Sequence, residues 1–182
     1  MVRMPVTVIL IFLSTIPAVA HSGLADTTGF LAGMLHPLSG VDHALAMLAV
    51  GAWAAMAGGR TRWHLPLSFV GGAGLGAWLA QLDLPLPLAE PLIVASVLFL
   101  GLFALIQLKI DGALAAALVF GFAIAHGLGH AAELPSGSPL PAAGVGFLAG
   151  SALPILAGMT LAGGLRCYLT SSTEVRAPRT TS

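Results

Sequence analysis

Residues 112–132 read GALAAALVFGFAIAHGLGHAA, an apolar run whose only ionisable side chains are two histidines. A helix that crosses a bilayer needs about 20 predominantly apolar residues. Because this run reaches that length without Asp, Glu, Lys or Arg, it predicts a membrane-spanning helix.

Four other segments have the same apolar character and a sufficient length. They are Thr28 to Ala57, Trp63 to Leu82, Leu88 to Leu108 and Leu140 to Leu165. The connections between them are short and contain helix breakers, so none can hold a soluble domain. The sequence therefore predicts an all-α polytopic membrane bundle with five transmembrane helices.

The composition excludes several classes of protein. Hydrophobic residues make up 57% of the 182 residues and charged residues 8%, whereas soluble domains carry about 25% charged residues. Lys plus Arg and Asp plus Glu both number 7, so no basic excess favours binding to nucleic acid. The single cysteine, Cys167, excludes an internal disulfide and a cysteine-based zinc site. Any metal ion would have to be bound by nitrogen and oxygen atoms.

The chain begins with features of a secretory signal. Arg3 precedes an apolar run from Val6 to Ile16, and Ala18-Val19-Ala20 fits a cleavage site between small residues. We predict a cleaved signal peptide at residues 1–20, a membrane domain at 21–169 and a disordered cytoplasmic tail at 170–182. The alternative is that residues 1–20 remain as an uncleaved anchor helix.

The basic residues predict an orientation in the inner (cytoplasmic) membrane of a bacterial cell. With the mature N-terminus outside and five spans, every basic residue of the mature chain falls on the cytoplasmic side, as the positive-inside rule requires. These residues are Arg60, Arg62, Lys109, Arg166, Arg176 and Arg179. The C-terminus is then cytoplasmic.

Ionisable side chains within a bilayer are costly, so their presence indicates function. The first span contains His36, Asp42 and His43, with Pro37 and Gly40 between the histidines. On an unbroken helix the histidines would lie about 10 Å apart, too far to share one ion. Either the helix unwinds between them, or there are two successive sites. Asp42 is then a ligand or a residue that orients His43.

The fourth span carries the second group of polar residues. His126, His130 and Glu133 are spaced i, i+4 and i+7, which places them along one stripe of a helix. Glu90 opens the third span, just before Pro91. The fifth span has no ionisable side chain, which favours a structural role.

Imidazole and carboxylate groups without thiolates suit nickel, cobalt, zinc or iron. In this interpretation the metal is cargo, and the sequence predicts no resident cofactor. A phosphate-binding loop of the P-loop type is absent from the sequence, which argues against direct coupling to ATP within this chain.

Glycines recur in two of the predicted spans. Gly71, Gly72, Gly74 and Gly76 lie in the second span, and Gly146 and Gly150 lie four apart in the fifth. Small residues at such spacing allow helices to pack closely in lipid. The alternative is a glycine-lined pathway in which backbone carbonyl groups face the substrate.

These motifs resemble those of the HupE/UreJ family of membrane proteins. The resemblance covers nearly the whole chain and rests first on His36, Asp42 and His43 within His-Pro-x-x-Gly-x-Asp-His. A second motif, His-Gly-x-x-His-x-x-Glu, is matched from His126 to Glu133, and Glu90 with Pro91 also fits the family. The family usually has Phe before this motif and Gly after its second His, where this chain has Ala125 and Ala131.

The resemblance implies the identity of the cargo and the direction of transport. The family is associated with nickel-dependent hydrogenase and urease and is regarded as a family of nickel permeases, with cobalt as a further substrate. The expected partners are the divalent ion, the lipid bilayer and a metallochaperone that receives the metal on the cytoplasmic side. Two alternatives stay open, a membrane protein that binds metal for enzyme assembly or sensing and a membrane metalloenzyme.

Overall fold

The computed structural model describes residues 29–82, 89–133 and 139–176, and every regular element within them is a helix. The all-α prediction is therefore confirmed for this part of the chain. The predicted signal peptide lies outside the described residues. The elements are α2 (Gly29–Ser39), α3 (Val41–Ala57), α4 (Thr61–Leu79), the short 3-10 helix η1 (Ala80–Leu82), α5 (Ala89–Leu105), α6 (Gly112–Glu133) and α7 (Leu140–Arg176).

Three helical stretches are long and apolar enough to cross a membrane. They are Thr61–Leu82, Gly112–Gly129 and Pro141–Tyr168, and the bent pair α2–α3 makes up to four. The remaining predicted span, the third (Leu88 to Leu108), corresponds to α5, whose apolar part, Pro91–Leu105, is shorter. A helix thus occupies each of the five predicted positions, while the number of five crossings stays a prediction.

The first predicted span, Thr28 to Ala57, is broken rather than continuous. Helices α2 and α3 meet at Gly40 with a bend of 82°. Pro37 lies inside α2 and has no N–H to donate, and the Ser39 hydroxyl donates to the carbonyl oxygen of His36 at 2.7 Å. The proline therefore weakens the last turn of α2, and the serine satisfies a carbonyl group at its end. A break therefore lies between His36 and His43, as in one of the two alternatives that the sequence left open.

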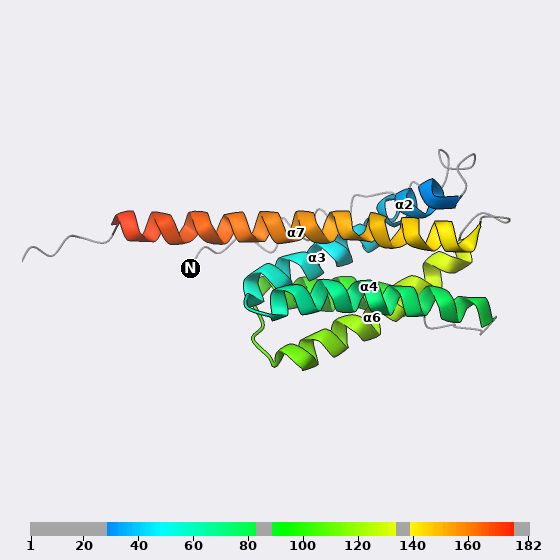
Figure 1. Cartoon of the computed structure of the whole chain (residues 1–182). Coiled ribbons are helices and arrows are strands. Elements are labelled where there is room, and N and C mark those ends of the chain that lie inside the picture. Colours follow the sequence, from blue (N-terminus) through cyan, green and yellow to red (C-terminus); the bar gives the residue numbers. More distant parts are fainter. Residues whose placement is uncertain (1–28, 83–88, 134–138, 177–182) are drawn as a thin grey trace, which may run out of the picture.

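The helices pack in two groups, one of α2, α3 and α7 and one of α4 and α6, and α5 joins them. Helix α7 lies along both α2 and α3, α4 pairs with α6, and α5 contacts α3 and α6 (Figure 1). Glycine makes these approaches close. A Cβ atom at Gly146 would fall on the carbonyl oxygen of Phe30, and one at Gly76 would fall on that of Ile124. Gly72 and Gly150 pack in the same way, so close packing is confirmed for these four of the six glycines.

The α5–α6 connection is held at both ends, which fixes how these two helices lie relative to each other. At the end of α5, Gln107 has φ 53°, and the Leu108 amide donates to the Phe103 carbonyl at 2.9 Å. This is a Schellman ending with a residue other than glycine in the left-handed position. The buried Trp53 indole donates to the Leu108 carbonyl at 3.0 Å, and Asp111 Oδ1 accepts from the amide of Ala113 at 2.9 Å and caps α6.

Helix α7 contradicts one prediction, because it continues to Arg176, into the segment 170–182 expected to be disordered. No Gly or Pro occurs between Leu165 and Ala177, so the sequence has no helix breaker over the residues by which α7 exceeds the predicted span. At 37 residues, α7 is about 55 Å long against a hydrocarbon core of about 30 Å. Its C-terminal part extends past the other helices (Figure 1).

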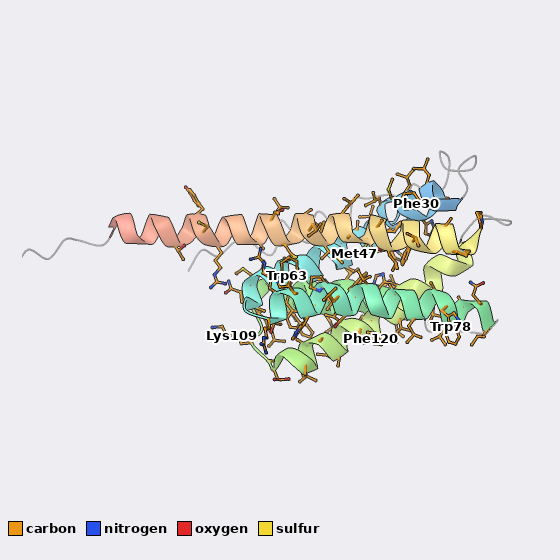
Figure 2. The ribbon with its side chains drawn as sticks, viewed as in Figure 1. Phe30, Met47, Trp63, Trp78, Lys109 and Phe120 are labelled. Atoms are coloured by element: carbon orange, nitrogen blue, oxygen red, sulfur yellow. The ribbon has the colours of Figure 1, made fainter. Side chains whose placement is uncertain are left out.

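Several basic residues lie at one end of the bundle. Arg166 donates to the carbonyl oxygen of Met56 at 3.4 Å, next to the turn that contains Arg60. Lys109 lies near the same end, whereas Trp78 lies at the opposite end (Figure 2). This is the clustering that the predicted topology requires, and the side of the membrane that this end faces stays a prediction.

We expect a reporter fused after Arg166 to be cytoplasmic and one inserted at Ser136 to be external. The physical reason is the clustering of Arg60, Lys109 and Arg166 at one end of the bundle, because such residues are retained on the cytoplasmic side. The measurement is a paired alkaline phosphatase and fluorescent protein assay on each fusion. External activity after Arg166 would reverse the orientation.

Candidate functional site

Asp42 and His43 form a hydrogen-bonded pair in the first turn of α3, directly after the break. His43 Nδ1 and Asp42 Oδ1 are 2.9 Å apart, and His43 is buried whereas the Asp42 side chain is 49% exposed. An ionised carboxylate only accepts hydrogen bonds, so Nδ1 carries the proton and Nε2 carries the lone pair. This contact is the one that an orienting residue would make, and the choice between the two roles that the sequence allowed for Asp42 stays a prediction.

Gly40 provides the space for this pair. Its φ of −92° and ψ of 116° are extended values that any residue adopts, so conformational freedom does not explain the glycine. A Cβ atom at this position would lie 2.8 Å from Nδ1 of His43 and 3.1 Å from Oδ1 of Asp42. Any larger residue would thus push directly on the two atoms that form the hydrogen bond.

His126 of α6 meets His43 in the interior of the bundle. The two imidazole rings have centroids 4.9 Å apart and an interplanar angle of 85°, an edge-to-face contact. His126 is 1% exposed, and Phe69 of α4 contacts its ring at a centroid distance of 5.4 Å. Helices α3 and α6 thus bring two histidines, both predicted as site residues, into contact, and α4 packs Phe69 against one of them.

Gly127, the glycine of the second motif, brings α6 close to α4 beside this contact. A Cβ atom at Gly127 would fall on the carbonyl oxygen of Ala73 and lie 2.7 Å from the amide nitrogen of Ala77. These are backbone atoms of α4, so they cannot move away as a flexible side chain could. The glycine that follows His126 is therefore a packing residue.

Ser96 of α5 is a site residue that the sequence analysis did not identify. Its side chain is fully buried, and its Oγ lies 2.7 Å from Nε2 of His126. A signal for it exists, because Ser96 is the only polar side chain between Pro91 and Leu105. Phe69 gave no comparable signal, since aromatic residues are common in apolar helices.

His36 is buried in α2, on the other side of the break from His43. Within residues 29–82, 89–133 and 139–176, no three His, Cys, Asp or Glu side chains whose placement is described lie together as a group that could hold a metal ion. The described part of the predicted site is thus the imidazole pair with Asp42 at its edge, and His36 across the break.

Three predicted ligands have a described backbone only. Glu90 lies at the start of α5, and His130 and Glu133 lie in the last turns of α6. Helix α6 is continuous from Gly112 to Glu133, so the i, i+4, i+7 register of its polar residues holds for the backbone. The side chains of these three residues lie outside the described part of the structure, and their role stays a prediction.

The fold and the imidazole pair together define a helical membrane protein with histidines buried between its apolar helices. The chain belongs to the HupE/UreJ family, because the family model described as HupE / UreJ protein matches residues 9–177. It is similar to Protein HupE of Rhizobium leguminosarum bv. viciae, with 38% identity over 148 residues that cover 81% of this chain and 78% of that protein. No solved structure matches the chain.

Proposed function

We propose that this protein is a permease that carries a divalent transition metal, nickel or cobalt, into the cell across the cytoplasmic membrane. The observation that carries the proposal is the contact between His43 and His126, two buried imidazoles from different helices. Membership of the HupE/UreJ family supports the choice of metal and the supply of metalloenzymes such as hydrogenase or urease. The metal is the substrate, so the protein acts as a carrier and not as an enzyme.

The geometry of the pair is compatible with a shared ion. Each metal–nitrogen bond is about 2 Å, so two imidazole nitrogens on one ion lie about 3 to 4 Å apart. Rings with centroids at 4.9 Å can satisfy that spacing with small rotations. The site offers nitrogen and carboxylate oxygen, which suits nickel and cobalt better than the all-oxygen preference of magnesium or calcium.

The remaining predicted ligands extend the pathway on either side of the pair. In the proposed orientation Glu133 and His130 lie outward of His126 along α6, where they would receive the ion first. His36 and Glu90 complete the proposed set of ligands. We propose that metal passes from one group to the next and leaves at the cytoplasmic end, where a metallochaperone would accept it.

Uptake of radioactive nickel into sealed vesicles that contain only this purified protein tests the proposal. We expect saturable accumulation above that of protein-free vesicles, competed by cobalt and not by magnesium, because the proposed ligands include imidazole nitrogen. Binding in detergent without accumulation in vesicles would instead favour a protein that holds metal for enzyme assembly. The absence of both binding and accumulation would contradict the proposal that nickel is the substrate.

A further inference from the structure

Ser96 makes two short polar contacts with a single hydroxyl group. Its Oγ lies 2.6 Å from the carbonyl oxygen of Ile93, one turn earlier in α5, and 2.7 Å from Nε2 of His126. Both contacts are fully buried. A hydroxyl group has one proton to donate and two lone pairs that accept, so the two contacts cannot both use its proton.

The Ile93 carbonyl decides how the proton is used. A carbonyl oxygen only accepts, so the contact at 2.6 Å is favourable when Ser96 donates to it. If Ser96 donated to His126 instead, two oxygen atoms would face each other at that distance without a proton between them. Ser96 therefore donates to Ile93 and accepts from His126, which requires a proton on Nε2.

The other ring nitrogen of His126 agrees with this assignment. Nδ1 is buried and makes no hydrogen bond within the described part of the chain. In the alternative tautomer this atom would be a buried N–H group without an acceptor there, which is unfavourable. With the proton on Nε2, Nδ1 is a lone pair, which is the form in which imidazole binds a metal ion.

We propose that Ser96 is a positioning residue that holds His126 as the Nε2–H tautomer and so presents Nδ1 as its metal-binding atom. The metal part of this inference rests on the proposed function, whereas the tautomer does not. The neighbouring His43 has the opposite arrangement, because Asp42 accepts from its Nδ1. The two rings in contact thus present different nitrogens, because Asp42 of the same helix holds His43 and Ser96 of α5 holds His126.

The tautomer can be measured directly in the metal-free protein. Nitrogen-15 NMR of the full chain with labelled histidine rings distinguishes Nε2–H from Nδ1–H, and the His126→Asn variant identifies the His126 signals. We expect Nε2–H in the wild type, a mixture of tautomers in Ser96→Ala, and Nε2–H again in Ser96→Thr, which keeps a hydroxyl group. A proton on Nδ1 in the wild type, or no change in Ser96→Ala, would overturn the proposal.

Ser151→Ala provides the matched control. Ser151 is also fully buried, but its hydroxyl donates to the Phe147 carbonyl of its own helix at 2.8 Å and contacts no histidine ring in the described part of the chain. Both alanine variants therefore lose one intrahelical hydrogen bond. A change in the His126 signals in both variants to the same extent would indicate a general effect of losing a buried hydroxyl and would overturn a specific role for Ser96.

Equilibrium nickel binding in detergent tests the consequence for the metal. Loss of a group that orients a metal-binding histidine costs about 10-fold to 100-fold in affinity, and we expect about 10-fold for Ser96→Ala. Ser96→Thr and Ser151→Ala should bind like the wild type. An unchanged affinity in Ser96→Ala would overturn the positioning role. A different outcome is that the NMR measurements give the expected tautomers but the wild type binds no nickel. That result would contradict the proposed function and would leave the effect of Ser96 on the His126 tautomer supported.

Discussion

Replacing His43 with alanine is expected to lower nickel uptake about 100-fold or more, to the level of protein-free vesicles. Mutating a residue that only orients a metal ligand already lowers metal affinity or activity about 10-fold to 100-fold. Removing the ligand itself should therefore lower uptake by at least the upper value. His43 is one half of the buried imidazole pair. Helix α3 contains no second histidine that could replace it. Uptake of radioactive nickel in vesicles with matched protein content measures the effect.

His64→Ala is the control for this variant. His64 lies in the first turn of α4 and is exposed, near the end of the bundle that carries the basic residues. Its loss removes an imidazole without touching the pair, so uptake should not change. Equal uptake by His43→Ala and the wild type would remove the first span from the mechanism, and equal losses in both variants would point to nonspecific metal binding.

Asp42 variants refine the same prediction, because the carboxylate contacts His43 and is itself half-exposed. Asp42→Asn keeps an oxygen that can accept from Nδ1 and loses only the charge, whereas Asp42→Ala loses both. We expect nickel affinity to fall about 10-fold in the first variant and about 100-fold in the second. Wild-type affinity in Asp42→Ala would show that the hydrogen bond does not serve metal binding.

Replacing Gly127 with alanine is expected to be the most destabilising single change of a small residue in α6. The added Cβ atom would meet backbone atoms of Ala73 and Ala77, so α6 and α4 would have to separate. Inserting one carbon into a close-packed site costs about 1 to 3 kcal/mol, and a contact with backbone places this variant at the upper end. Unfolding in mixed detergent micelles measures the change in free energy of unfolding.

Gly121→Ala is the matched control, because it lies in the same helix and a Cβ atom there meets nothing within 4 Å. Alanine is favoured over glycine in a helix by about 1 kcal/mol, so this variant should be neutral or stabilising. Because Gly127 follows His126, its alanine variant should also weaken nickel binding, whereas Gly121→Ala should not. Equal stability of the two variants would contradict the close approach of α4 and α6.

The sequence alone determined the positions of the helices, and it offered a break in the first of them as one of two alternatives. Runs of apolar residues as long as a bilayer is thick leave few alternatives to a helix, because backbone groups in lipid must be hydrogen-bonded within the segment. The physical reason for that alternative was Pro37, which lacks an amide proton, but only the structure showed the break at Gly40. The stripe from His126 to Glu133 followed from helical periodicity, which is a local property.

The tertiary structure alone decided which faces meet and which polar residues contact one another. Lipid is as apolar as the interior of the bundle, so residues that face lipid and residues that face a neighbouring helix carry the same hydrophobic signal. The sequence therefore could not predict that α4 pairs with α6, or that Ser96 of α5 reaches His126. It left Asp42 open between ligand and orienting residue, because that choice depends on the rotation of the first turn of α3. The sequence showed Gly40 and Gly127 as members of the two motifs. Only the structure gave the physical reason for these glycines, because a Cβ atom at either position would collide with neighbouring atoms.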